Sequence, residues 1–241
     1  MSLPQALLDD YAPTSVLRVA LNHGNRVLVG RDADGKPIGI AVDLATALAD
    51  LLGLPLRFVE FDRAVDVSSS AGDDLWDVCF LAVDPKRMET IDFTAPYIRI
   101  EGNYLSAPGT LAADAQELVD LGCRVGTVEG TAYTLALSRL PGAGNLVAYH
   151  DILAALEALD SGEVEAIAGI REAMEGESRK RPGSRILTPP FMEIRQAMAM
   201  PRGRALASAH LRETLADFAR SGLVGDILER HGVSRDCALV G

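Results

Sequence analysis

The sequence predicts an α/β protein built from two lobes that are joined by two crossing strands. Short apolar runs typical of buried strands alternate along the chain with segments whose apolar residues recur at helical spacing, and this alternation favours parallel-rich sheets. The 241 residues suffice for two small domains. Because the chain breaks at Pro108-Gly109 and a strand at 195–200 returns, we expect lobe 1 to comprise 1–107 plus 197–241 and lobe 2 to comprise 108–196.

The composition is that of an ordinary globular protein, with 48% apolar and 24% charged residues. Lys and Arg total 23 against 34 Asp and Glu, which gives a net charge of −11. A negative surface repels phosphate backbones, and the densest basic run, 179–181, fits an exposed loop. We therefore expect no nucleic-acid partner, and no apolar run is long enough to predict a membrane span.

The N-terminal residues and the cysteines bear on location and on cofactors. Residues 1–10 show neither the basic segment nor the long apolar segment of a signal peptide. This leaves open a cytoplasmic protein and a chain from which a leader was removed.

The three cysteines, Cys79, Cys123 and Cys237, form no CxxC spacing and no cluster with histidine. We therefore expect neither a metal site nor a cofactor, and the sequence leaves open one disulfide among them.

In the first lobe, apolar runs predict strands at 16–21, 37–42 and 54–61. A helix is expected after the second strand, capped by Asp43 and ended by Gly53. Residues 62–75 are weakly patterned and predict a short helix or a loop. The inner face of the first helix is expected to carry Leu44, Leu48, Leu51 and Leu52.

The segment 76–97 holds the first candidate site. The run 78–83 predicts a buried strand, which Asp84-Pro85 breaks. Ligands of open α/β sheets bind outside the carboxyl ends of strands, so Arg87, just past this strand, is suited to gripping an anion. A solvated surface arginine explains the same residue equally well. A strand at 98–106 follows.

The second lobe repeats the alternation of helices and strands. Asp151 is expected to cap one of its helices. Strands are expected at 124–128, 145–149, 164–169, 185–187 and 195–200. Helices are expected at 116–122, from 131 with Tyr133, Leu135, Leu137 and Leu140, after 151 with Ile152, Leu153, Leu156 and Leu159 on the inner side, and at 171–180. Two C-terminal helices are expected to carry Leu211, Leu215, Phe218 and Ala219, and then Val224, Ile227 and Leu228, on their apolar faces.

Two further candidate sites lie at strand ends of this lobe. Gly130 and Thr131 join a strand to a helix N-terminus, where free N–H groups favour an anion. A helix cap without a ligand explains them as well, and a phosphate loop is excluded because no Gly-Lys-Ser/Thr follows. Arg171 is a second candidate anion partner, or it pairs with Glu175 one helical turn on.

No catalytic signature accompanies these sites. The four histidines are scattered, and neither GxSxG nor HExxH occurs. The residues alone therefore indicate a two-lobed α/β protein with anion-binding geometry and no evident catalytic machinery, which we expect not to be an enzyme.

The order and spacing of several short motifs resemble the family 3 solute-binding proteins of ABC transporters, the amino-acid-binding periplasmic proteins. The resemblance covers about residues 14 to 233. Its pieces are Leu17-Arg18-Val19, the run 32–45, Trp76-Asp77-Val78, Pro85-Lys86-Arg87 with the run 91–97, Val125-Gly126 with Gly130-Thr131, the run 156–162 and the C-terminal 211–232.

This resemblance implies a type II periplasmic-binding fold whose two lobes close on a ligand by a hinge motion. It implies that Arg87 takes the ligand carboxylate and that Thr131, with Gly130, supports it from the other lobe. It further implies a periplasmic monomer that binds a small carboxylate-bearing solute, an amino acid or organic acid, for an ABC permease.

The chain departs from the family pattern at ligand-contacting positions. Ile170 stands where an Asp usually takes the ligand's amino group, and Asp84 stands where a Thr is common. Asn25, in the turn that begins at Asn22, replaces the usual aromatic residue. An ammonium without an acidic partner is costly to bury. We therefore hypothesise a small carboxylate ligand, with any second acidic group met by Arg171.

Two other functions fit the same fold. Some relatives are cyclohexadienyl dehydratases, in which a cleft carboxylic acid protonates a leaving hydroxyl. Glu129 or Glu172 fits that role only if burial raises its pKa. A cytoplasmic ligand-sensing module is the third interpretation.

Overall fold

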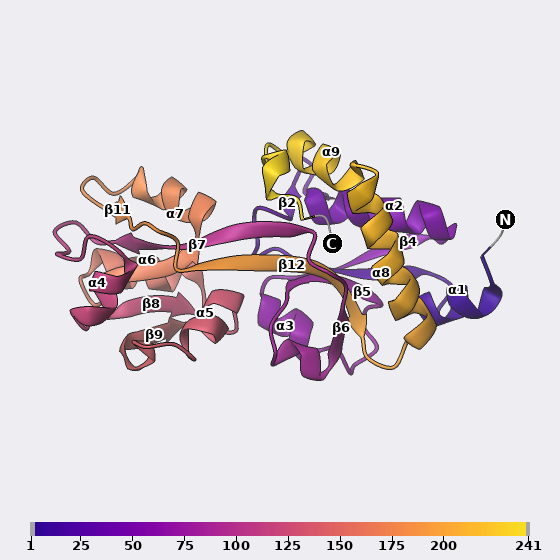
Figure 1. Cartoon of the computed structure of the whole chain (residues 1–241), viewed down its shortest axis with the longest axis horizontal. Coiled ribbons are helices and arrows are strands. Elements are labelled where there is room, and N and C mark those ends of the chain that lie inside the picture. The colour runs from indigo at the N-terminus through magenta and orange to yellow at the C-terminus, as the bar shows by residue number, and fades with distance from the viewer. Residues whose placement is uncertain (1–2, 240–241) are drawn as a thin grey trace. The chain divides into compact units, whose positions relative to one another are not determined.

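A computed structural model describes residues 3–239 and divides the chain into two compact units. Unit 2 comprises Ile100–Ile194, and unit 1 comprises the chain before and after it. The chain enters unit 2 within β7 (Ile98–Ser106) and leaves it within β12 (Met192–Pro201) (Figure 1). Residues 1, 2, 240 and 241 of the predicted lobe 1 lie outside the described residues.

The predicted boundaries after residues 107 and 196 differ slightly from this division. Pro108-Gly109 marks the end of β7, whereas the change of unit falls near its beginning. The reason is that β7 from Gly102 onward already pairs with β10 (Ala166–Ile170) of unit 2.

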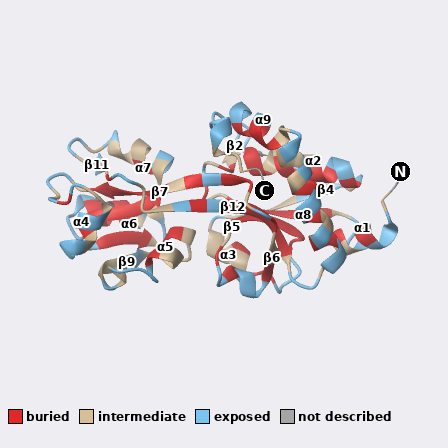
Figure 2. Ribbon diagram, viewed as in Figure 1, coloured by how far each residue is buried: buried red, intermediate tan, exposed pale blue. Residues whose placement is uncertain are grey.

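The sheet of unit 1 has the strand order β4-β1-β5-β12. β1 (Leu17–Asn22) lies parallel to β4 (Leu56–Phe61) and to β5 (Val78–Ala82), as the alternation of elements predicts. β12 and β6 (Ile91–Phe93) add antiparallel pairings. Every residue of β1 and β5 is buried, so these strands form the centre of the unit (Figure 2).

Helices surround this sheet. Figure 1 shows α1 beside α8 and α2 beside α9, and both pairs are in contact. A short hairpin precedes α2. The remaining elements of unit 1 are α1 (Gln5–Tyr11), β2 (Gly30–Arg31), β3 (Pro37–Ile38), α2 (Ile40–Leu52), α3 (Ala64–Ser69), η1 (Arg87–Glu89), α8 (Ala205–Arg220), α9 (Leu223–Arg230) and η3 (Arg235–Cys237).

The start of α2 corrects the sequence prediction. The expected strand at 37–42 is wrong beyond Ile38, because α2 already begins at Ile40. Gly39 precedes it with φ 126°, so the turn needs a glycine. Asp43 therefore lies inside the first turn and caps nothing; its Oδ2 instead accepts hydrogen bonds from Arg230 (2.8 Å) and His231 (3.0 Å).

The end of α2 is confirmed at Gly53, which adopts the left-handed conformation at φ 65°. Leu44, Leu48 and Leu52 are buried as expected. Leu51 is 51% exposed, so its place on the inner face is wrong.

The sheet of unit 2 has the strand order β7-β10-β8-β9. β8 (Val125–Val128) is parallel to β10 and to β9 (Leu146–Tyr149). β7 pairs with β10 in antiparallel fashion, and β11 (Arg185–Ile186) pairs with β7 in the same way. The other elements are α4 (Ala115–Asp120), α5 (Ala132–Leu137), η2 (Ala143–Asn145), α6 (Ile152–Asp160) and α7 (Arg171–Ser178).

The helices of unit 2 largely follow the predictions. The Oδ1 of Asp151 accepts the N–H of Ala154 at 2.9 Å, which confirms the predicted cap of α6. Leu156 and Leu159 are buried, but Leu153 is 66% exposed and its inner position is wrong. α5 ends at Leu137, so Leu140 lies outside this helix.

The state of the cysteines and the character of the helices were two questions raised by the composition. Cys79, Cys123 and Cys237 are all free in the structure, which answers the question of a disulfide that the sequence left open. Within residues 3–239, no helix has both the length and the apolar character needed to cross a membrane.

Candidate ligand-binding site

Arg87 begins the short helix η1, which follows the turn after the last residue of β5, Ala82. Its side chain is buried, since the residue is only 4% exposed, and this disagrees with a solvated surface arginine. Its Nη1 donates a hydrogen bond to the carbonyl of Ala82 at 3.0 Å, the last residue of β5. Burial lowers the pKa of Arg87, while the charges of Asp84 and Cys79 act in the opposite direction.

Asp84 sits in the turn between β5 and Arg87. It is 3% exposed, its Oδ1 accepts the N–H of Lys86 at 2.9 Å, and its carbonyl accepts the N–H of Met88 at 3.0 Å. These bonds fold the segment into a tight turn. A buried carboxylate therefore stands three residues before the buried guanidinium and acts on it electrostatically.

Asn22 and Asn25 lie at the end of β1. Asn22 is 9% and Asn25 6% exposed. Their Oδ1 atoms accept the N–H of Gly24 (3.0 Å) and of Val27 (3.2 Å), which shapes the turn. Because β1 and β5 are parallel neighbours, their carboxyl ends share one edge of the sheet, and the structure brings all four predicted residues of unit 1 to that edge.

Thr131 is the N-cap of α5 in unit 2. Its Oγ1 accepts the N–H of Thr134 at 3.3 Å and donates to the carbonyl of Val128 at 2.9 Å. Gly130, before it, has φ 67°. The helix-cap interpretation of these residues is therefore confirmed, and a ligand role of Thr131 stays a prediction that this geometry permits.

Arg171 begins α7, directly after Ile170 at the end of β10. Its Nε donates to Glu175 at 2.9 Å and its Nη1 to Glu101 at 2.5 Å. These hydrogen bonds raise the pKa of Arg171. The pairing with Glu175 was one of the two interpretations of the sequence, and the guanidinium is shared between two carboxylates.

The sequence analysis missed Glu101, whereas it named Glu172, the residue after Arg171, as a candidate proton donor. Glu101 is the only carboxylate of β7, in which Arg99 is the other charged residue, and this carboxylate was the available signal. Desolvation raises the pKa of Glu172, but the residue is exposed to solvent, which weakens this effect. Around Arg171, the acidic side chains thus outnumber the basic one.

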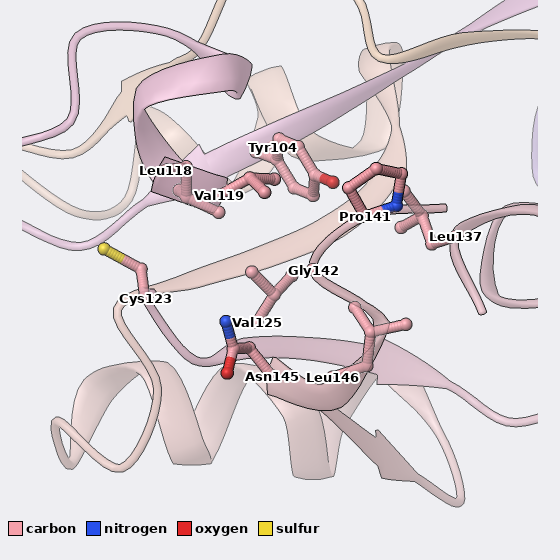
Figure 3. A pocket seen from close by; sticks show the side chains of 10 residues that line it. All are labelled: Tyr104, Leu118, Val119, Cys123, Val125, Leu137, Pro141, Gly142, Asn145 and Leu146. Atoms are coloured by element: carbon pink, nitrogen blue, oxygen red, sulfur yellow. The ribbon is translucent and has the colours of Figure 1, made fainter. Parts of the chain in front are cut away.

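A cavity in unit 2 lies between β8 and the segments that cover one face of it (Figure 3). Its lining is mostly apolar and contains no predicted site residue. The lining residues are Tyr104, Leu118, Val119, Cys123, Val125, Leu137, Pro141, Gly142, Asn145 and Leu146. In the part of the chain that the structure describes, no group of three His, Cys, Asp or Glu side chains is arranged to hold a metal ion.

Known proteins resemble this chain in fold. The solute receptor for L-cysteine of Neisseria gonorrhoeae matches with a TM-score of 0.80 at 20% identity, covering 98% of this chain and 99% of that one. A mutant of ArgBP from T. maritima matches with a TM-score of 0.77 at 19% identity, covering 94% and 99%. The ancestral amino acid-binding protein AncCDT-1, a precursor of cyclohexadienyl dehydratase, matches with a TM-score of 0.75 at 18% identity, covering 92% and 97%.

These likenesses establish the fold, which is that of type II periplasmic binding proteins. None of the curated protein sequences matches the chain. The model of the bacterial extracellular solute-binding proteins, family 3, matches residues 17–233, nearly the whole chain. The chain belongs to the bacterial extracellular solute-binding proteins of family 3.

Proposed function

We propose that this protein binds a small carboxylate-bearing solute, an amino acid or an organic acid, between its two units, which close on the ligand by a hinge motion. The observation that carries the proposal is Arg87, a buried guanidinium at the carboxyl end of β5 in a member of the solute-binding family. A planar guanidinium matches a carboxylate with two parallel hydrogen bonds.

The edge of unit 1 supports an anion contact in a further way. Asn22 and Asn25 lie at the end of the neighbouring strand and are nearly as buried as Arg87. In unit 2, Gly130 and Thr131 present the N-terminus of α5, and helix N-termini favour negative charge. We include these residues in the proposed contacts and name Arg87 as the principal one.

Arg171 has a smaller place in the proposal than the sequence suggested. Its guanidinium is paired with Glu101 and Glu175, so a second acidic group of a ligand would have to displace carboxylates already in place. The hypothesis of a second carboxylate at Arg171 therefore has little support, and Ile170 adds no polar atom.

Thermal unfolding with a ligand panel tests the proposal. The panel holds the twenty L-amino acids together with succinate, L-malate and 2-oxoglutarate, with glucose and spermidine as compounds that lack a carboxylate. A true ligand at about 100 times its Kd stabilises the folded state by about 2.7 kcal/mol. Stabilisation by glucose or spermidine, with no response to any carboxylate, would exclude the proposed ligand class.

We also propose a role as the substrate-binding component of an ABC-type transporter, in the periplasm and as a monomer. Membership of the extracellular solute-binding family supports it. We expect permease and ATPase genes next to the coding sequence. We also expect to recover the protein in the periplasmic fraction of the cell. Sedimentation at the mass of one chain would agree with a monomer.

A second candidate is a dehydratase related to cyclohexadienyl dehydratase. The residue that supports it is Glu172, an exposed carboxyl next to Arg171 whose pKa is raised, which would help it to donate a proton to a leaving hydroxyl. Incubation with prephenate and with arogenate, followed by ultraviolet absorbance of the aromatic products, tests this candidate. Turnover that Glu172→Gln abolishes and Glu175→Gln retains would favour the enzyme over the binding protein.

A further inference from the structure

We infer that residues 234–239 form a C-terminal strap, which holds the first residues of the crossing strand β7 and thereby restrains the hinge between the two units. The inference rests on the proposed function in one respect, since hinge closure on a ligand is part of that proposal. The strap lies beyond residues 17–233, which match the family model, so membership of the family assigns it no role.

The strap lies against the beginning of β7. Ala238 pairs with Ile98 in antiparallel fashion. The N–H of Leu239 donates a hydrogen bond to the carbonyl of Tyr97 at 2.9 Å. The strap thus contributes a backbone partner to the chain at the point where β7 starts.

Tyr97 is held from several sides at this point. Its N–H donates to the carbonyl of Gln196 in β12 at 2.9 Å, while its carbonyl accepts the N–H of Leu239. Its side chain is buried, and the ring meets that of Phe80 of β5 edge to face, with the ring centres 6.2 Å apart. Because β12, β5 and the strap all contact Tyr97, this residue is a fixed point within unit 1.

The other end of the strap is tied to α9. Arg235, in η3, donates hydrogen bonds to the carboxylate of Asp226 and, at 3.1 Å, to that of Glu229. Gly225 leaves room for this side chain, since a Cβ there would lie 2.6 Å from Nη1 of Arg235. The strap therefore connects a helix of unit 1 to the beginning of β7.

The contacts of the strap reach the place where β7 leaves unit 1. Nη2 of Arg99, the last residue of unit 1 before β7 enters unit 2, donates to the carbonyl of Asp236 at 3.2 Å. The pairing of β7 with β10 begins at Gly102. Ile100 and Glu101 lie between these two points, and a hinge motion would bend β7 there.

Loss of the strap would let the bend extend back toward Tyr97. The free protein would then sample more conformations, and ligand binding would have to order them. The strap is therefore expected to slow local opening of β7 in the free protein and to strengthen ligand binding.

Hydrogen exchange of the full chain without ligand, followed by mass spectrometry, tests the inference. Leu239→Pro removes the N–H that bonds the carbonyl of Tyr97, and Ala238, with φ −66° and ψ 138°, tolerates a following proline. Leu239→Ala is the matched control, because it changes the side chain and keeps the N–H. Exchange at residues 97–101 is expected to be at least about tenfold faster in Leu239→Pro than in the wild type and the control.

Two results would overturn the inference. The first is unchanged exchange at residues 97–101 in Leu239→Pro, and the second is equal acceleration in β4, which would mean that the whole of unit 1 has lost stability. If circular dichroism shows that Leu239→Pro does not fold, Arg99→Gln takes its place, with Arg57→Gln as the control. Both arginines are exposed on strands, and Arg99 bonds the strap. At least about threefold faster exchange at residues 97–101 in Arg99→Gln alone is then expected.

Ligand affinity separates this inference from the proposed function. For a compound that stabilises the wild type in the ligand panel, calorimetry should give Leu239→Pro a Kd at least about threefold higher than that of Leu239→Ala. Equal Kd values despite faster exchange would contradict a restraint on the hinge. If no compound of the panel binds, the proposed function fails, whereas the exchange rates still decide whether the strap holds β7.

Discussion

Arg18 and Asp77 form a two-point ion pair inside unit 1, with Nε of Arg18 2.9 Å from Oδ2 of Asp77 and Nη2 2.8 Å from Oδ1. Asp77 is completely buried. Its carboxylate also accepts the N–H of Arg18 at 2.8 Å and Nη1 of Arg204 at 2.6 Å. One buried carboxylate thus joins the start of β1, the residue before β5 and the segment before α8.

This network lies at the amino ends of the parallel strands, opposite the edge that carries Arg87. Arg18 and Asp77 come at the beginnings of β1 and β5, while Asn22 and Arg87 come at their ends. We therefore expect this network to stabilise the unit, while the proposed ligand contacts lie at the other edge.

Asp77→Asn is expected to destabilise unit 1 by about 3–5 kcal/mol, because it leaves two arginines without their buried counter-charge. Urea unfolding followed by circular dichroism measures the loss. Asp74→Asn is the control: Asp74 also pairs with Arg18, but its side chain is 71% exposed and solvent replaces the contact. An equal loss of unfolding free energy in both variants would contradict the claim that the buried Asp77 stabilises unit 1 more than the exposed Asp74.

Gly39→Ala is expected to destabilise by about 2 kcal/mol or more, since only glycine readily adopts φ 126° and a Cβ there would lie 2.5 Å from the carbonyl of Leu28. Gly35→Ala is the control. Gly35 has φ 79° with no atom within 4 Å of a built Cβ, so it loses only the conformational preference, about 1 kcal/mol. Urea midpoints that fall equally would show that the close contact at Gly39 costs nothing.

The same glycine explains one limit of the sequence analysis. Residues 37–42 are apolar and follow a turn, which is typical of a strand, so the helix start at Ile40 was missed. The helix begins after Gly39, which adopts φ 126° and approaches the backbone of Leu28 closely, and neither feature is visible in the local pattern of residues 37–42. Elements with strong local signals, such as β5, β7 and the cap of α6, were predictable within about a residue.

The candidate site was likewise predictable from the sequence only in part. The position of Arg87 after β5 was predictable from the strand and the Asp-Pro break, but its burial was not, because burial depends on segments far along the chain. The sequence offered Glu175 as a partner of Arg171 from helical spacing. It did not offer Glu101, which reaches Arg171 across 70 residues of chain through the pairing of β7 with β10.

Thr131→Ala is expected to lower the stability of unit 2 by about 1 kcal/mol, because the N–H of Thr134 loses its cap. Asp151→Ala, which removes the cap of α6, is expected to have a similar cost. If Thr131 also contacts the ligand, only Thr131→Ala weakens the stabilisation by a hit of the ligand panel. Equal ligand responses of the two variants would restrict Thr131 to capping.

Arg181→Gln is expected to destabilise unit 2 at neutral pH and to lose this effect in acid. Nε and Nη2 of Arg181 donate to Asp160 at 2.7 and 2.9 Å, and Nη1 donates to Glu177 at 2.6 Å. The bond from Arg181 lowers the pKa of Asp160, and the bonds from Lys180 and then Arg181 lower that of Glu177.

The sign follows from these lowered values. A carboxyl whose folded pKa is depressed stabilises the protein above its unfolded pKa, and this contribution is lost as the pH falls through the folded pKa. The difference in urea midpoint between wild type and Arg181→Gln should therefore be present at pH 7 and shrink below the usual values of 3.8 for Asp160 and 4.5 for Glu177. A difference that grows in acid would contradict the assignment. Lys180→Gln, at an exposed side chain, should have a smaller effect at pH 7.

Arg87→Lys is expected to weaken binding of a ligand found in the panel by at least about tenfold, because lysine keeps the charge but cannot form two parallel hydrogen bonds with a carboxylate. Calorimetry measures the change, and Arg57→Lys, at an exposed position of β4, is the matched control.

Arg87→Ala is a weaker test of whether Arg87 binds the ligand carboxylate. It empties a buried site and removes the opposite charge beside Asp84, so a loss of about 3 kcal/mol in stability would accompany the loss of binding. Wild-type affinity in Arg87→Lys would leave Arg87 with a structural role, as the buried guanidinium that holds the end of β5 through the carbonyl of Ala82.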